Sequence, residues 1–136
     1  MADHTSHLKR VPLFADIPDE QLRRIANSAR ERQFAAGTAI VTTGETGHGF
    51  YLIMTGRADV QHEGRTVRTL GPGEYFGELA LLRDTARSAT VTAREPTTCL
   101  QLTRWDFKGL LDAHPALALH LLETVAERIH DDETAR

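Results

Sequence analysis

The feature that most limits the fold of this chain is a central stretch of short, β-rich runs separated by glycines, from Arg32 to Thr103. Runs of this kind, bounded by turn-forming residues, are typical of an antiparallel sandwich or barrel rather than of a parallel sheet. The glycines between them supply the backbone conformations that tight turns need. The expected strands are Thr38–Thr43, Phe50–Thr55, Ala58–His62, Thr66–Leu70, Ala89–Ala93 and Thr98–Thr103.

Helical patterns flank this stretch on both sides. Before it, a start signal at Asp16 or at Pro18-Asp19 precedes apolar residues at helical spacing. After it, Thr103 is a suitable N-cap for a helix that breaks at His114-Pro115, because proline cannot continue a helix. A second C-terminal helix is expected over Ala116–His130.

Length and charge limit the classes of protein that this chain can belong to. With 136 residues we expect one domain, residues 1–136, whose ends at 1–7 and 131–136 are mobile tails. The net charge of −3 argues against direct DNA binding through broad neutralisation of phosphates. No apolar run has the length of a membrane span, and the N-terminus lacks the apolar core of a signal peptide. We therefore expect a cytoplasmic protein without a membrane partner.

Residues that suit a phosphorylated ligand gather in two segments, Phe76–Leu82 and Arg87–Val91. Gly77 permits close approach of the backbone, and Glu78 opens a short apolar run that we interpret as one helical turn. The unpaired N–H groups at such a helix start attract phosphate, and Arg87 can hold the same phosphate with two charge-assisted hydrogen bonds. Phosphate repels the Glu78 carboxylate, which should therefore accept from a neighbouring hydroxyl. A ribose phosphate offers both groups.

The two segments together resemble the phosphate-binding cassette of the cyclic nucleotide-binding domain family. The family pattern is Phe-Gly-Glu, two or three small or aliphatic residues, a variable loop, and then Arg, a small residue, Ala, Thr and Val. The resemblance assigns Glu78 to the ribose 2′-hydroxyl and Arg87 to the cyclic phosphate. The ligand-binding residues that it implies are Gly77, Glu78, Leu79, Ala80, Arg87, Ser88 and Ala89. In one departure, Ala86 replaces the proline of many members, so we expect a looser loop over residues 83–86 when the site is empty.

The resemblance covers roughly Leu8 to His130, and the order of one helix, many short strands and two helices is the family's layout. It implies a mainly β fold with flanking helices. The expected architecture is an antiparallel β-roll or jelly-roll (double-stranded β-helix) with an N-terminal helix and two C-terminal helices. It further implies a binding domain with no catalytic residue, no metal and no cofactor, whose ligand is a cyclic purine nucleotide.

Ser88 bears on the choice between cAMP and cGMP. In the family, threonine at this position is associated with guanine because its hydroxyl can reach the 2-amino group of that base, and alanine lacks such a contact. Serine has the hydroxyl but occurs in members that favour adenine. Alternatively, the Ser88 hydroxyl bonds only the phosphate. This residue favours cAMP and leaves cGMP open.

The last helix has two interpretations. Its apolar stripe can cover the barrel within one chain, or it can close over the base or pair with a second copy or an effector domain. The residues of this lid or seam would be Leu122, Val125, Ala126 and Ile129. We therefore predict a cAMP sensor in signal transduction whose C-terminal helices change position when the ligand binds.

Two alternatives from other classes stay open. The first is a nucleotide-independent interaction or dimerisation module on the same fold, although such a module has no need of Glu78 or Arg87. The second is a metal enzyme on a cupin-like barrel, which is disfavoured because the seven histidines are scattered without a His-x-His pair followed by glutamate. The single cysteine, Cys99, excludes a four-cysteine iron–sulfur cluster.

Overall fold

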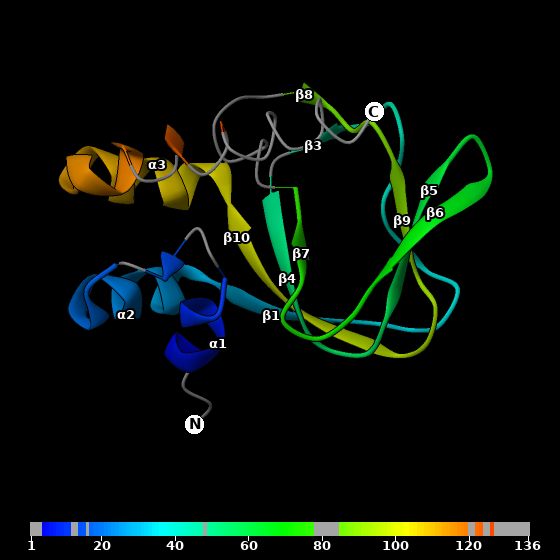
Figure 1. The fold of residues 1–136 in the computed structure, drawn as a ribbon, viewed down its shortest axis with the longest axis horizontal. Helices are drawn as coiled ribbons and strands as arrows, with labels where there is room; N and C mark the ends of the chain where they lie inside the picture. The colour runs from blue at the N-terminus through cyan, green and yellow to red at the C-terminus, as the bar shows by residue number, and fades with distance from the viewer. Residues whose placement is uncertain are drawn as a thin grey trace.

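A computed structural model of the chain describes residues 4–11, 14–15, 17–47, 49–77, 85–119, 122–123 and 126. The helices before and after the strands are α1 (Thr5–Lys9), α2 (Asp19–Ser28) and α3 (Arg104–Ala113), and residues 115–119 are again helical. The strands are β1 (Arg30–Phe34), β2 (Ala39–Val41), β3 (Thr46–Gly47), β4 (Gly49–Thr55), β5 (Ala58–His62), β6 (Arg65–Leu70), β7 (Tyr75–Phe76), β8 (Thr85–Ala86), β9 (Thr90–Ala93) and β10 (Thr97–Thr103). Figure 1 labels these elements.

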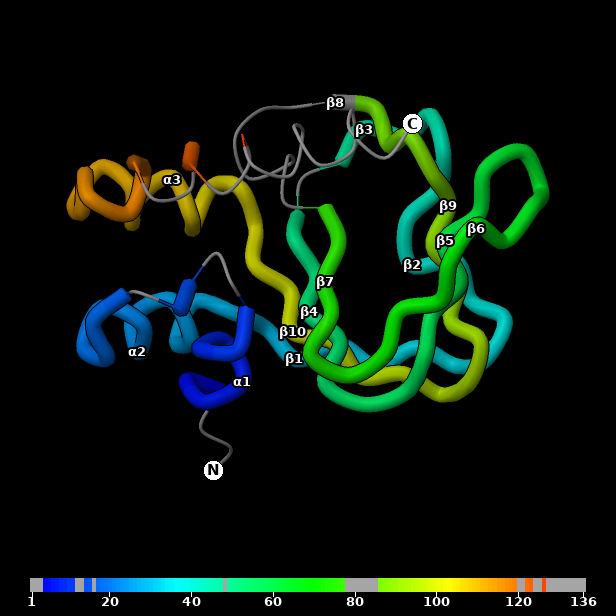
Figure 2. Tube along the Cα trace, in the orientation of Figure 1, coloured from blue at the N-terminus to red at the C-terminus, as the bar shows by residue number. Residues whose placement is uncertain are grey.

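The strands form a roll with two larger sheets and one short ribbon. One sheet has the order β1-β10-β4-β7, the other has the order β2-β9-β5-β6, and β3 pairs with β8. All of these pairings are antiparallel. Figure 2 shows the two sheets on opposite sides of the roll, with the β3–β8 ribbon at one end and the helices gathered beside the β1-β10-β4-β7 sheet. The expected antiparallel β-roll with flanking helices is confirmed.

Strand β4, in the sheet nearest the helices, is buried on both faces, and its successive side chains point to opposite sides. In β4, Phe50 and Leu52 belong to the core cluster shared with the helices. Tyr51 and Ile53 belong to a second cluster inside the roll. Both clusters therefore fix the position of β4, which carries part of the candidate site on its inner face.

Three phenylalanines join the N-terminal segment and α3 to this sheet. The side chain of Phe14 is fully buried, and its ring contacts those of Phe50 and Phe107 edge-on, at centroid distances of 5.8 and 6.3 Å. Helix α3 begins with the predicted cap, since Thr103 Oγ1 accepts a hydrogen bond from the Asp106 N–H. The start of α3 is thus held against the sheet by both packing and capping.

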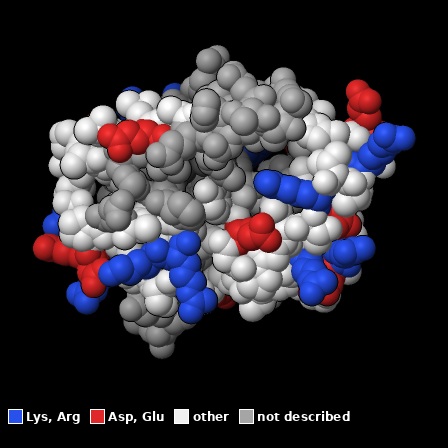
Figure 3. Space-filling model, viewed as in Figure 1, with Lys and Arg blue, Asp and Glu red and all other residues white. Residues whose placement is uncertain are grey.

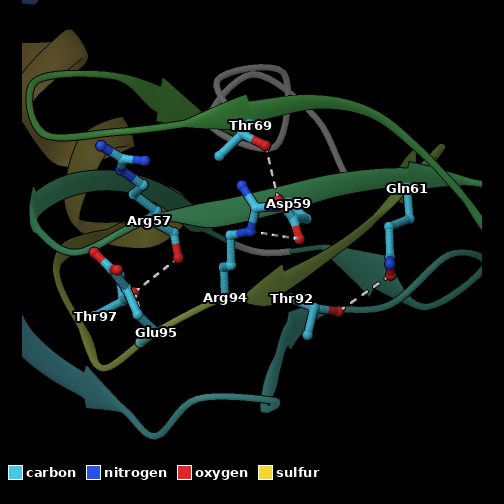
Figure 4. A network of polar contacts seen from close by, with 8 residues as sticks. All are labelled: Arg57, Asp59, Gln61, Thr69, Thr92, Arg94, Glu95 and Thr97. Carbon is cyan, nitrogen blue, oxygen red and sulfur yellow. Dashed lines mark hydrogen bonds and ion pairs between the residues drawn. The ribbon is translucent and has the colours of Figure 1, made fainter.

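Hydrogen bonds on the outer face of the other sheet connect its strands (Figure 4). Asp59 on β5 accepts from Thr69 on β6 at 2.8 Å and lies 3.8 Å from the Arg94 side chain. Thr92 on β9 donates to Gln61 on β5 at 3.3 Å. These polar partners satisfy one another on the side of the sheet that faces away from the roll, so we regard them as sheet-stabilising contacts.

Three local features differ from the expectations. Strand β1 was not expected, because its sequence Arg-Glu-Arg-Gln-Phe lacks an apolar face, and four of its five residues are exposed. Thr85 and Ala86 form strand β8 where a loop was expected, because β3 offers them a partner. Residues Thr5 to His7 lie in helix α1 rather than in a tail, and Thr5 and Leu8 of this helix are buried. Residues 1–3 and 131–136 of the expected tails lie outside the described residues.

Candidate functional site

A pocket of about 200 Å³ lies between the two sheets, toward the β3–β8 ribbon. Its walls come from β2, the turn between β2 and β3, β3, β4 and β10, together with one residue that follows β8. The lining residues are Ile40, Val41, Thr42, Glu45, Thr46, Gly47, Gly49, Tyr51, Arg87 and Gln101. Pockets for drug-sized ligands usually measure roughly 300–1,000 Å³, so we expect a nucleotide to extend beyond this volume.

The backbone of Arg87 is fixed on both sides by the turn before β3. Its N–H donates to the Glu45 carbonyl at 2.9 Å, and its own carbonyl accepts from the Gly44 N–H at 2.9 Å. The preceding residues of β8 pair with β3. Pairing with the segment around β3, which is distant in the sequence, therefore fixes the position of the Arg87 Cα and Cβ atoms.

The Arg87 side chain runs along the wall of the pocket and is half-buried. Its Nη2 atom donates to the backbone carbonyl of Gly49 at 2.7 Å. Removing a charged group from water is costly unless it has polar partners, and this carbonyl supplies one. A guanidinium has five N–H donors in a planar fork, and this geometry matches the paired oxygens of an anion such as phosphate.

Two glycines, Gly47 and Gly77, lie against this side chain, and we call them the glycine cradle. A Cβ atom built on Gly47 would overlap the Arg87 guanidinium. A Cβ on Gly77 would lie 2.6 Å from Arg87 Nη1 and 2.7 Å from the Gly49 carbonyl oxygen, and the φ of Gly77 is +84°. The space that Arg87 occupies therefore exists because these positions lack side chains.

A polar chain of three residues runs from the exposed Arg32 through Gln101 to Tyr51, and the last two line the pocket. Arg32 Nη1 donates to Gln101 Oε1 at 2.9 Å, and Gln101 Nε2 donates to the Tyr51 hydroxyl at 3.0 Å. Burial raises the pKa of Tyr51 above its usual value, against the opposing effect of the Arg32 and Arg87 charges. The Tyr51 hydroxyl therefore keeps its proton at neutral pH.

Sequence reasoning missed most of these pocket residues. The run Phe50–Ile53 is apolar throughout, so alternation does not reveal that Tyr51 faces the pocket. Gln101 did carry a signal, because it stands alone between Leu100 and Leu102 in a strand. A polar side chain at that position must face something other than the helix-side core.

The structure brings together Gly77 and Arg87, two of the predicted ligand-binding residues. Ser88 is exposed and Ala89 is half-buried, and neither lines the pocket. Glu78, Leu79 and Ala80 lie outside the described residues, so their roles stay predictions. In the expected C-terminal seam, Leu122 and Ala126 are exposed, whereas Val125 and Ile129 lie outside the described residues.

Charged residues of both signs are scattered over the face seen in Figure 3 rather than gathered by sign. Within the described ranges, no three His, Cys, Asp or Glu side chains are grouped so that they could hold a metal ion. None of the helices in that part of the chain combines the length and hydropathy of a membrane span.

Comparison with known proteins gives a family match over most of the roll. Residues 31–114 match the family described as "Cyclic nucleotide-binding domain". A cAMP-dependent protein kinase regulatory subunit of Yarrowia lipolytica is 40% identical over 106 residues, which cover 76% of this chain and 28% of that protein. A cGMP-dependent protein kinase of Eimeria tenella is 42% identical over 103 residues, covering 76% of this chain and 10% of that protein. The chain thus spans only a minor part of either relative.

Solved structures show the same architecture. The N-terminal domain of a transcriptional regulator from Streptomyces coelicolor A3(2) superposes with a TM-score of 0.83 at 32% identity, covering 95% of this chain and 94% of that one. The Thermus thermophilus catabolite activator protein gives a TM-score of 0.80 at 32% identity, over 91% of this chain and 61% of that one. A structure described as cAMP-bound PfPKA-R gives a TM-score of 0.81 at 25% identity, covering 96% of this chain and 44% of that one.

Proposed function

Because this chain belongs to the cyclic nucleotide-binding domain family, we propose that it is a regulatory module that binds cAMP in the pocket beside Arg87 and performs no chemistry on it. The observation that supports this best is the half-buried guanidinium held at the pocket wall by the Gly49 carbonyl. A cation placed at the wall of a pocket, with a planar fork of N–H donors, is suited to an anionic ligand.

The phosphate and the ribose of the ligand each have an expected partner. The cyclic phosphate bonds to Arg87 and to the backbone around Gly77, Leu79 and Ser88, while Glu78 accepts from the ribose 2′-hydroxyl. These roles come from the match of the sequence to the family pattern. The position of Gly77 next to Arg87 supports the phosphate assignment, since the two residues would meet the same group.

The choice of cAMP over cGMP rests on Ser88, because relatives of this chain are named for each nucleotide. The test is calorimetric titration of both nucleotides into protein that has been unfolded, freed of bound ligand and refolded. We expect one-to-one binding with the tighter constant for cAMP, and a Ser88→Thr variant should shift the preference toward cGMP. Tighter cGMP binding by the wild type would contradict the choice of base, and no binding of either by folded protein would contradict the function.

The signal would pass through the C-terminal helices. Ligand binding can move an equilibrium only if the two helix positions differ in affinity for the ligand. Helix α3 follows directly from β10, which lines the pocket with Gln101, so a change at the pocket has a short path to the helix. We propose that α3 and the following helical residues take a new position on the roll when the pocket fills.

A second candidate function, protein interaction, is favoured by exposed apolar side chains on the same helical part. Trp105, Leu119 and Leu122 have 63%, 60% and 57% of their surface exposed. We propose that Leu122, Val125, Ala126 and Ile129 form a seam with a second copy or with an effector domain in the cytoplasm. Sedimentation with and without cAMP tests this seam. Assembly that ignores nucleotide would favour the interaction module, and a monomer at all concentrations would exclude a homodimer.

A further inference from the structure

Among the described residues that line the pocket, Tyr51 is the aromatic one, and its ring is held from two sides. It stacks on Phe76 with centroids 5.2 Å apart and planes at 14°, and it contacts Phe34 edge-on at 6.4 Å. The side chain is 8% exposed, and it lines the pocket together with Arg87. The hydroxyl therefore has a fixed position that depends on ring packing rather than on its own hydrogen bonds.

The direction of the Tyr51 O–H bond follows from the polar chain. Arg32 can only donate, so the Gln101 amide must turn its oxygen to Arg32 and its nitrogen to Tyr51. The hydroxyl oxygen consequently accepts from Gln101, and its hydrogen is available for another acceptor. Among the described residues, no group accepts from this hydroxyl.

The hydrogen bonds of the polar chain all donate in one direction, from the Arg32 cation toward the pocket. Arg32 donates to Gln101 in an exposed bond, Gln101 donates to Tyr51 in a part-buried bond, and the first bond polarises the second. An O–H group at the end of such a series is a strengthened donor. Because Arg87 lines the same pocket, the acceptor that benefits most is the anionic group drawn there by its charge.

We propose that the Tyr51 hydroxyl is a second side-chain hydrogen-bond donor, beside Arg87, to the phosphate of the bound nucleotide, and that Gln101 and Arg32 are positioning residues that turn its hydrogen into the pocket. This inference rests on the proposed function, since it needs a phosphate beside Arg87. It adds a phosphate contact from β4, a strand that is remote in sequence from the segment around Gly77 and Arg87.

The test is a Tyr51→Phe variant, which keeps the ring and removes only the hydroxyl. A hydrogen bond to a charged group contributes enough that its loss should weaken binding by about tenfold or more. Because both nucleotides carry the same phosphate, cAMP and cGMP should lose equal factors and keep their ratio. Tyr75→Phe is the matched control, since Tyr75 packs against the helix-side core and does not line the pocket.

Gln101→Met tests the positioning role. It should weaken binding in the wild-type background and have no further effect in the Tyr51→Phe background, because the hydroxyl that it orients is then absent. Additive losses would contradict the polar chain as an orienting device.

Three outcomes separate this inference from the function beneath it. Unchanged binding by Tyr51→Phe, with binding still lost in Arg87→Ala, would overturn the inference and leave the proposed function standing. A changed ratio of cAMP to cGMP affinity would place the contact on the base and also overturn the inference. Failure of the folded wild type to bind either nucleotide would overturn both.

Discussion

The Arg87 guanidinium donates to the backbone carbonyl of Gly49 at 2.7 Å, although the two residues lie 38 positions apart in the sequence. The bond joins the segment after β8 to the first residue of β4. It holds a positive charge at the wall of the pocket. A ligand phosphate would therefore meet a guanidinium that is already oriented, which lowers the cost of binding.

The glycine cradle should be necessary for this orientation. In Gly47→Ala the new Cβ would overlap the Arg87 side chain, so the guanidinium must move away from the Gly49 carbonyl. We expect a loss of cAMP affinity of about tenfold or more, because the charged contact is then misplaced. Calorimetry on the refolded variant measures this loss.

Gly109→Ala is the matched control for the cradle variant. Gly109 lies in α3 with open space around its Cβ position. The substitution should leave affinity unchanged and stabilise the protein by roughly 0.5–1 kcal/mol, because alanine costs less backbone entropy than glycine in a helix. Equal affinity of Gly47→Ala and Gly109→Ala would show that the cradle does not position Arg87.

Movement of α3 can be observed through Trp105, the single tryptophan of the chain. The indole is 63% exposed on α3, so a new position of this helix should change its surroundings. We expect its emission to shift as cAMP saturates the protein, with the same midpoint as in calorimetry, and to stay constant in Arg87→Ala. An emission spectrum that is unchanged at saturation would argue against repositioning of α3.

The packing of Phe14 should be a main source of stability. Its fully buried ring joins the N-terminal segment to both β4 and α3. Phe14→Ala should lower the free energy of unfolding by about 3–5 kcal/mol through the cavity that it leaves. Val67→Ala, at an exposed position of β6, should stay within about 0.5 kcal/mol of the wild type in the same urea titration. A similar midpoint for both variants would contradict this assignment of the core.

The buried Cys99 should make stability fall at alkaline pH. Burial raises the pKa of its thiol to about 12, whereas in the unfolded chain the thiol ionises near its ordinary value of about 8.5. Between these values the unfolded state binds fewer protons than the folded state, so this contribution to stability is present below pH 8.5 and lost as the pH rises to 12. The free energy of unfolding of Cys99→Ala should decline less steeply over this range. Rapid labelling of the native thiol at pH 8 would contradict the burial.

How far the sequence predicts this structure depends on how local each feature is. The boundaries of β5 agree with the expected Ala58–His62, because a glycine precedes the run and another follows it. The two-residue strands β7 and β8 form only because they pair with β4 and β3. These pairings are distant in sequence, so no local pattern predicts them. Such strands can be identified only from the three-dimensional structure.

The candidate site divides in the same way. Gly77 and Arg87 were predicted because they lie in one contiguous motif. The Gly49 carbonyl and the Tyr51 hydroxyl were not, because backbone groups and residues within an apolar run show no sequence signal for a polar role. Sequence therefore predicted the cation of the pocket, and the fold was needed to find what holds it.

The central claim is that Arg87 anchors a cyclic nucleotide in this pocket, and calorimetric titration of cAMP into wild type and Arg87→Ala tests it most directly. Arg57→Ala is the matched control, because the exposed Arg57 makes its hydrogen bonds through its backbone carbonyl, away from the pocket. We expect one-to-one binding by the wild type and by the control. The Arg87 variant should bind at least about thirtyfold more weakly, as for loss of one partner of a buried charge pair. Equal affinities of all three proteins for cAMP, with each shown to be folded, would contradict the account.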